Sequence, residues 1–540
     1  MNYLFLELFQ QRLSRDCRRL DQLAQFRMES AYLNTTGLNT VHFKTSTRKL
    51  NFVNNIVLIT VDCLRARNVS CYGYEQPTTP QIDEIAADGI QFNECFANGP
   101  FTSASFPSIL GSIYFNMYEQ KHFPEKATLL SEAFGDAGYE TIGLNAANPN
   151  VGCAFDYNQG FDAFVDWLIS YPSPSTGQTS ETSTEGLQIK RYLRNRFKSH
   201  DRAYEMARRA YEEIYNPVLQ PYKMLRNYVS FFRGETPNAF SNPVCPSAAT
   251  VVDEAIEWLD SRTSEQPFFM WLHLMDPHSW YDPDPDHLTA LGYENESRLT
   301  RLNANRALNT SDEAARPHMD VLKRLYDGTV RQVDTAVGRL YGELDERGLS
   351  DDSYLIFTSD HGEEFLEHGR TKHSDQLHSE LIDVPLIVNG PEVPAVTVDE
   401  PVQLLDLAPT LLNLVGASVP DEYLGADHSA AIHDPAAAVS SAPVVSETPA
   451  AGNRRLVSVR NEAFTYIRNW KTDARVLFDR NVDPHEQHDI SDERPDIVEK
   501  LDLVAEDHVD FVTENRITID EKSEDVSPDI KQQLADLGYK

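Results

Sequence analysis

The chain contains 540 residues, of which 41% are hydrophobic and 10% aromatic, so it can bury a sizeable core in one large domain and a smaller one. Its 83 acidic and 48 basic side chains give a formal net charge of -35, which disfavours nucleic acid as a partner because phosphate binding requires cationic side chains. Such a surface predicts either a halophilic protein kept soluble by charge or an acidic mesophilic enzyme, and we favour the halophilic source.

Cysteine spacing and hydropathy indicate the compartment. Six cysteines are scattered without a CxxC pair, which is typical of reduced thiols rather than of a disulfide framework. No apolar run approaches the ~20 residues of a membrane span, and Glu7 introduces a charge too early for a signal peptide. We therefore expect a cytoplasmic protein without a membrane span; the sequence pattern specifies no oligomeric state.

The first part of the chain contains an extension and then a strand that ends in a carboxylate. Residues 1–50 form a mildly basic N-terminal extension, which we interpret as a solvated helix, a docking arm or the product of an upstream start. Residues 55–61 are apolar and rich in β-branched side chains, which predicts a buried strand, and Asp62 follows at its end. The next polar segment, 99–112, carries several of the Ser and Thr residues favoured at a helix start.

A helix and a strand follow, and then a polar insertion. Residues 129–134 have a helical pattern and 138–144 a strand pattern, an order typical of α/β proteins. Residues 171–250 are expected to be an insertion that begins with a loop rich in Ser, Thr and Pro. Its basic part, 187–233, is either a solvated helix face or a grip for an anionic substrate or a lipid surface.

A second strand with a polar end follows a long helix. Apolar side chains recur at spacings of three and four over residues 326–344, which predicts one face of a helix. Residues 355–359 then form an apolar run that ends in Asp360 and His361. Crossover helices bring the ends of parallel strands to one edge of a sheet, so Asp62 and this Asp-His pair are expected to meet at one cation.

The alternation of strands and helices predicts a layered α/β domain over residues 51–435. An Ala/Pro/Ser-rich connector follows. Residues 436–510 are expected to form a smaller C-terminal α+β subdomain, and residues 511–540 an acidic tail.

Several motifs lie in the same order as in a known family and cover most of residues 51–500. They are the segments 55–74, 99–114, 271–278, 358–369, 381–388, 405–412 and 477–487. With them the chain resembles the sulfatase family, within the alkaline phosphatase-like superfamily, in a haloarchaeal type. The resemblance implies a mixed, mostly parallel sheet sandwiched by helices, and metal-dependent hydrolysis of sulfate or phosphate esters. It also implies that Asp62, Asp360 and His361 hold the metal beside the nucleophile.

The resemblance leaves two candidates for the nucleophile. One register places Thr102 at the family position without a gap. The other aligns Ser105 with the Cys/Ser-x-Pro-Ser-Arg signature that directs conversion to formylglycine, but Ile109 stands where that signature requires Arg. We favour Thr102, which cannot become formylglycine and would form a covalent phospho- or sulfo-enzyme. On this reasoning a phosphate ester is at least as well supported as a sulfate ester.

The metal and the substrate contacts also follow from the resemblance. Many sulfatases have a second Asp after the first metal ligand, whereas this chain has Cys63, so Ca²⁺, Mn²⁺, Zn²⁺ and Mg²⁺ all stay candidates. His278 is expected to steady the transferred group or to protonate the leaving oxygen. Asn148, Lys372 and His373 are expected to bind a small anionic ester, with a second metal as the alternative for the histidine. The alternative functions are a phosphoglycerol- or phosphoethanolamine-type transferase and a non-catalytic member of the fold.

Overall fold

The structure is a computed structural model that describes residues 54–118, 122–124, 126–167, 245–434, 437, 439, 442–450 and 455–517. The expected N-terminal extension, the basic segment and residues 518–540 lie outside the described residues. No helix among the described residues is long and apolar enough to cross a lipid bilayer.

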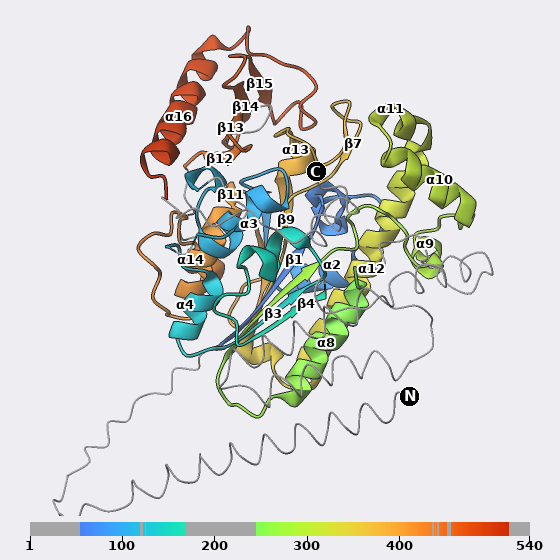
Figure 1. The fold of residues 1–540 in the computed structure, drawn as a ribbon, viewed down its shortest axis with the longest axis vertical. Helices are drawn as coiled ribbons and strands as arrows, with labels where there is room; N and C mark the ends of the chain where they lie inside the picture. The colour runs from blue at the N-terminus through green and yellow to red at the C-terminus, as the bar shows by residue number, and fades with distance from the viewer. Residues whose placement is uncertain are drawn as a thin grey trace, which may run out of the picture. The chain divides into compact units, whose positions relative to one another are not determined.

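A mixed sheet of nine described strands forms the central layer (Figure 1). Across the sheet the strands are β10 (Val396–Val398), β2 (Ile90–Phe96), β9 (Asp383–Asn389), β6 (Ser353–Ser359), β1 (Asn55–Val61), β5 (Phe268–Leu274), β3 (Glu140–Asn145) and β4 (Ala163–Asp166), while β11 (Val402–Gln403) also pairs with β2. Strand β9 runs antiparallel to β2 and β6, and the other described pairs of this sheet are parallel. The expected mixed, mostly parallel sheet is confirmed.

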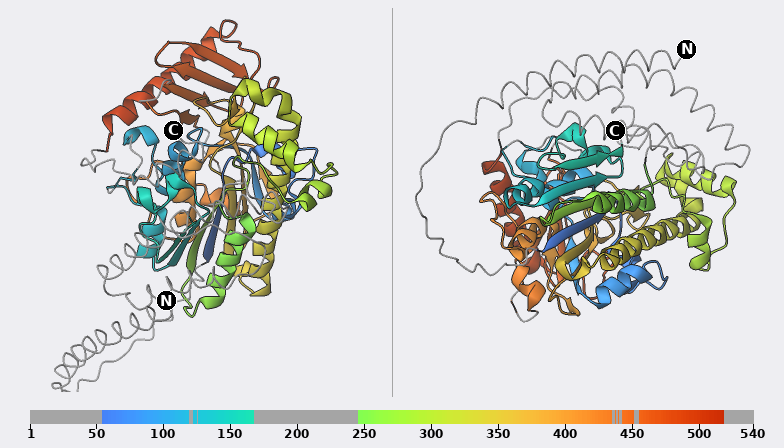
Figure 2. Two further views of the ribbon diagram at one scale, coloured as in Figure 1. Left: turned by 45° about the vertical axis from the view of Figure 1, so that its right-hand side comes forward. Right: turned by 90° about the horizontal axis from the view of Figure 1, so that it is seen from below.

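Helices cover both faces of this sheet (Figure 2). One layer contains α2 (Pro80–Ala87), α8 (Ala248–Ser261) and α12 (Met319–Glu346), and the other contains α3 (Thr102–Gly111), α4 (Leu130–Asp136) and α14 (Leu407–Leu414). Side chains of β1 alternate between the two layers, because successive strand residues point to opposite faces. Val57 and Ile59 pack with the first layer, and Ile56 and Leu58 with the second.

The expected helices and strands near residues 130, 140 and 330 are present as α4, β3 and α12. In α12, the apolar face expected over residues 326–344 is buried against the sheet. The remaining short elements are β7 (Glu364–Phe365), β8 (Thr371–Lys372), α9 (Pro285–Ala290), α10 (Arg298–Leu308), α11 (Asp312–Ala315), α13 (Ser379–Ile382) and α15 (Ser429–His433).

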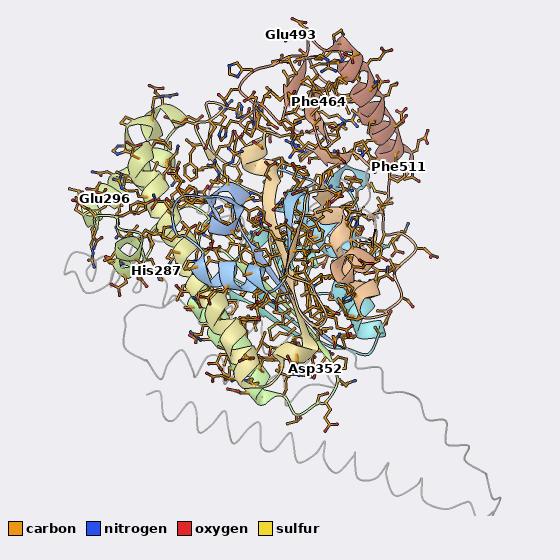
Figure 3. The ribbon with its side chains drawn as sticks, turned by 180° about the vertical axis from the view of Figure 1, so that it is seen from behind. His287, Glu296, Asp352, Phe464, Glu493 and Phe511 are labelled. Carbon is orange, nitrogen blue, oxygen red and sulfur yellow. The ribbon has the colours of Figure 1, made fainter. Side chains whose placement is uncertain are left out.

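A second, antiparallel sheet forms the C-terminal subdomain. Its elements are β12 (Val444–Glu447), β13 (Leu456–Arg460), β14 (Phe464–Asn469), β15 (Arg475–Asp479) and the helix α16 (Pro495–Glu514). Phe464 and Phe511 mark this subdomain in Figure 3, whereas Asp352, just before β6, lies at the far end of the central sheet. Helix α16 ends at Glu514, four residues beyond the boundary at residue 510 that we expected between the subdomain and the acidic tail.

Apolar and charged contacts join the subdomain to the central domain. Val444 and Phe478 of the small sheet pack with Leu377 and Leu381 around α13. The carboxylate of Glu486, which is 2% exposed, accepts the backbone amide of Ser379 at 2.9 Å. It also lies 3.2 Å from the Nδ1 of His378 and 3.7 Å from the guanidinium of Arg460.

Candidate active site

The register of two parallel strands places two carboxylates side by side. The last residues of β1 and β6, Val61 and Ser359, pair in register, so Asp62 and Asp360 follow at neighbouring strand ends. The Ser359 hydroxyl lies 2.5 Å from the carbonyl oxygen of Val61 and accepts the backbone amide of Leu64 at 3.0 Å. One buried hydroxyl therefore ties together the two loops that carry the carboxylates.

Asp62, Asp360 and His361 form one fully buried group. The Nε2 of His361 lies 3.5 Å from Asp62 Oδ1 and 3.5 Å from Asp360 Oδ2. The Nδ1 of His361 lies 2.8 Å from the carbonyl oxygen of Gly362, a contact that places the proton on Nδ1 and leaves Nε2 as a lone-pair donor toward the carboxylates. The structure thus brings together the three residues that the sequence predicts as metal ligands.

The electrostatics of this group suit a divalent cation. Burial and the charge of Asp62 raise the pKa of Asp360 well above its usual range. Burial alone would raise the pKa of Asp62, but the nearby imidazoles of His273, His278 and His361 outweigh it and lower this pKa. Burial and His373 lower the pKa of His361 to about 4, so its imidazole is neutral at pH 7.

The donor set fits such an ion. Asp360 Oδ2 is buried and makes no hydrogen bond among the described residues. Two carboxylates, one neutral imidazole and a hydroxyl are a ligand set for a divalent metal.

Thr102 is the hydroxyl that reaches this group. It is the first residue of α3, and its Oγ1 lies 3.5 Å from Asp62 Oδ2 and 3.4 Å from His361 Nε2. Ser105, one turn along the same helix, is also buried, but its hydroxyl has no hydrogen-bond partner among the described residues. The structure therefore brings the Thr102 hydroxyl, and not that of Ser105, to Asp62 and His361, at a helix N-terminus suited to an anion.

Asn148 joins the same group through its amide nitrogen. Its Nδ2 donates to Asp62 Oδ2 at 2.7 Å and lies 3.3 Å from Thr102 Oγ1, while its Oδ1 accepts the backbone amide of Asn150 at 2.9 Å. This second hydrogen bond fixes the orientation of the amide, with the nitrogen toward the carboxylate. Asn148 is therefore held where it can contact both the Thr102 hydroxyl and a bound anion.

His273 is a buried site residue that the sequence analysis missed. Its Nε2 lies 3.2 Å from Asn148 Nδ2 and 3.7 Å from Asp62 Oδ2, and its Nδ1 lies 3.0 Å from Thr60 Oγ1. The ring of Phe106 packs edge-on against it, with the ring centroids 4.9 Å apart. The available signal was a histidine inside the apolar run of β5, a polar residue that a buried strand tolerates only with partners.

His278 and His373 lie beside Cys63, and the ring of His373 also packs against His361, with the ring centroids 4.9 Å apart. The ring centroids of His278 and His373 are 5.4 Å apart, and Cys63 Sγ lies 3.5 Å from His373 Nδ1. The thiol of Cys63 also donates to Asp62 Oδ1 at 2.8 Å. Glu363 is 3.4 Å from His373 Nδ1 through its Oε1, and its Oε2 accepts the Tyr281 hydroxyl at 2.8 Å. Both predicted histidines are therefore next to the metal-ligand candidates.

Lys372 differs from the other candidates. Its ammonium group donates to Asn309 Oδ1, just after α10, at 2.5 Å. Burial lowers the pKa of Lys372 from its usual value, against the opposing effect of nearby Glu363.

Lys372 has a left-handed backbone with φ of 64°, as does Cys63 with φ of 63°. Such strained residues cluster at functional sites, and these two directly adjoin His373 and Asp62.

Two family models and several named relatives match this chain. The family model described as Sulfatase matches residues 54–417, and the model described as N-sulphoglucosamine sulphohydrolase, C-terminal, matches residues 367–507. An arylsulfatase of Clostridium perfringens is 26% identical over 69% of this chain and 76% of its own length. Human (Homo sapiens) iduronate 2-sulfatase is 25% identical over 68% of this chain and 70% of its own length.

Solved structures share the fold. A protein in complex with its substrate D-glucosamine-2-N,6-O-disulfate is 19% identical, with a TM-score of 0.61 over 86% of this chain and 98% of that chain. The phosphonate monoester hydrolase of Agrobacterium radiobacter is also 19% identical, with a TM-score of 0.58 over 86% and 96% of the two chains. The first family match spans more than half of the sequence, so this chain belongs to the sulfatase family and is a sulfuric ester hydrolase.

Proposed function

We propose that this enzyme hydrolyses sulfate esters by a covalent mechanism in which Thr102 is the nucleophile and Asp62, Asp360 and His361 hold a divalent metal ion. The observation that carries the proposal is the position of Thr102 Oγ1, within 3.5 Å of both Asp62 and His361 in a fully buried group. When bound, the ion supplies a positive charge that lowers the pKa of the hydroxyl and attracts an oxygen of the ester.

The proposed reaction has two steps. Thr102 Oγ1 attacks the sulfur, the bond from sulfur to the ester oxygen breaks, and the alcohol leaves with a proton, which gives a sulfo-threonine. Water then attacks the sulfur of this intermediate, which restores the threonine hydroxyl and releases sulfate. Thr102 cannot supply the aldehyde of formylglycine, so the route through a hydrated aldehyde is closed to it.

Other residues of the site bind and orient the reacting groups. Asn148 Nδ2, 3.3 Å from Thr102 Oγ1, orients the nucleophile and then contacts the transferred group. We assign His278 and His373 to the sulfate group, with His278 either steadying it or protonating the leaving oxygen. Lys372 contributes positive charge near the substrate only after its side chain leaves Asn309.

The relatives favour sulfate over phosphate. The relatives described above are named as sulfatases, so the expectation that a phosphate ester is at least as well supported as a sulfate ester is not kept. The transferase and the non-catalytic alternatives are not favoured either. The Thr102 hydroxyl lies next to Asp62 and His361, and His361 in turn lies next to Asp360. A catalytic member of the family requires a hydroxyl beside its metal ligands, whereas a binding module does not.

The proposal can be tested with chromogenic substrates. We expect 4-nitrophenyl sulfate to be turned over with a higher kcat/KM than 4-nitrophenyl phosphate or bis(4-nitrophenyl) phosphate, each measured with added Mn²⁺, Zn²⁺, Mg²⁺ and Ca²⁺. The matched blank is Thr102→Ala under the same conditions, which reports any contaminating hydrolase. Faster turnover of the phosphodiester than of the sulfate would overturn the assignment of the substrate class.

A further inference from the structure

We propose that Cys63, His278 and His373 bind a second divalent cation, with zinc as the best chemical match, beside the Asp62–Asp360–His361 group. The inference deepens the proposed function and relies on it only for the position of the ester. Metal binding itself can be measured without turnover. One ligand atom from each of the three residues lies within 4.8 Å of the other two.

The spacing of the ligand atoms suits zinc. With Zn–S near 2.3 Å and Zn–N near 2.05 Å, a tetrahedral site places a sulfur and a nitrogen ligand about 3.5 Å apart. The distance between Cys63 Sγ and His373 Nδ1 is 3.5 Å. Three protein ligands leave a fourth position open, as in zinc sites that carry out catalysis rather than hold a fold together.

Hydrogen bonding orients His278, and the backbone conformation orients Cys63. The Nδ1 of His278 lies 2.8 Å from the carbonyl oxygen of Ser279, which places its proton there and directs the lone pair to Nε2. Histidines that bind metals commonly donate their other ring N–H to a backbone carbonyl in this way. The left-handed backbone of Cys63 (φ of 63°) turns its thiol from the end of β1 toward His373.

Charge balance favours the same ion. One thiolate and two neutral imidazoles leave a net charge of +1 on a divalent ion, and the buried Glu363 carboxylate, 3.4 Å from His373 Nδ1, is placed to compensate it. Thiolate ligands select zinc over magnesium, calcium and manganese, which prefer oxygen ligands. Cys63 thus changes the metal chemistry of a position where an aspartate would support an oxygen-liganded ion.

Binding couples the two metal groups through one proton. The Cys63 thiol donates to Asp62 Oδ1 at 2.8 Å. When its sulfur binds the ion, the S–H bond breaks, the proton passes to solvent and no electron is transferred. Asp62 then loses this hydrogen bond, so its Oδ1 is free for the first ion, while its Oδ2 keeps the hydrogen bond from Asn148. With both imidazoles bound to the ion, His278 and His373 would act on the sulfate group through the charge of the ion, and His278 would keep its Nδ1 proton and not protonate the leaving oxygen.

The experiment measures metal binding by the full-length protein and three variants. After zinc loading and dialysis, we expect two zinc ions per chain in the parent protein and in the control Cys71→Ser, a half-buried cysteine outside the site. We expect one in Cys63→Ser and one in Asp360→Asn. Titration with Co²⁺ should give a near-ultraviolet thiolate-to-cobalt band in the parent, in Cys71→Ser and in Asp360→Asn, but not in Cys63→Ser.

The cobalt band decides the outcome, because the acidic surface can hold additional zinc weakly. Absence of the band in the parent protein, or its persistence in Cys63→Ser, would overturn the second site, and the parent spectrum requires no variant to fold. If the band is absent while chelation still abolishes sulfate turnover, the proposed function stands and this inference fails. If the band is present but no sulfate ester is turned over, the second metal site stands and the proposed function fails.

Discussion

Replacement of Thr102 by Ala removes the hydroxyl that contacts both Asp62 and His361. Without it no covalent sulfo-enzyme can form, and only binding and electrostatic effects remain. In serine hydrolases, which also form a covalent intermediate on a hydroxyl, removal of a triad residue lowers kcat by about 10⁴- to 10⁶-fold. We therefore expect a loss of at least ~10⁴-fold, which is about 5.4 kcal/mol of transition-state stabilisation. Thr102→Ser keeps the hydroxyl, so its kcat should stay within about tenfold of the parent.

Ser105→Ala is the matched control on the same helix. Its hydroxyl is buried and unpaired among the described residues, so the alanine removes an unsatisfied polar group and no contact with the site. We expect kcat/KM to change by less than about twofold and the free energy of unfolding to stay equal or to rise by up to about 1 kcal/mol.

Steady-state kinetics with 4-nitrophenyl sulfate and urea unfolding of both variants would measure these effects. Mass spectrometry of a peptide over residues 102–108 after acid quench should show the sulfo group on Thr102 in the parent. If Ser105→Ala abolished activity while Thr102→Ala kept it within tenfold of the parent, the nucleophile assignment would be wrong.

Three further outcomes follow from the structure. Chelation should abolish sulfatase activity and lower Tm, because an ion at a hundred times its Kd stabilises the folded state by about 2.7 kcal/mol. Added Mn²⁺ or Zn²⁺ should restore both the activity and the Tm. Activity that survives strong chelators would exclude the metal role. Burial would raise the pKa of Glu486, but hydrogen bonding to His378 and the charge of Arg460 lower this pKa from 4.5 to about 2. The ionised carboxylate therefore stabilises the folded state fully above pH 4.5, and this contribution is lost as the pH falls toward 2. Urea unfolding at several acidic pH values should therefore show a flatter acid limb for Glu486→Gln, and an unchanged limb would refute the assignment. Molar NaCl should raise Tm if the net charge of -35 reflects a halophilic protein, whereas a flat or falling Tm would contradict it.

The sequence predicted the parts of the site that lie on regular structure. Asp62 and Asp360 could be placed together because strand patterns and the rules of parallel sheets fix where strand ends meet. Thr102 followed from the register of the motif, and its position at the start of α3 agrees with that register. The halophilic source, the cytoplasmic location and the domain boundaries stay predictions.

Side chains that depend on tertiary packing could not be predicted in this way. His273 contacts Asn148 and Thr60 only because β5 lies beside β1, and its spacing in the sequence gives no sign of these partners. The approach of Cys63 to His373 joins two loops that are 310 positions apart. Lys372 was expected at the substrate, but its hydrogen bond to Asn309 could not be anticipated from the motif.

The buried carboxylate of Glu486 has a consequence for shortened forms of the enzyme. A chain cut in the connector near residue 436 would retain every proposed catalytic group, yet it would leave Leu377 and Leu381 facing water and the amide of Ser379 without its acceptor. Such a fragment would lack the Glu486 carboxylate and the apolar side chains of the small sheet that cover Leu377 and Leu381. The smallest autonomous enzyme therefore includes the second sheet. Fusion partners and purification tags are therefore better attached after α16 than used to replace the C-terminal subdomain.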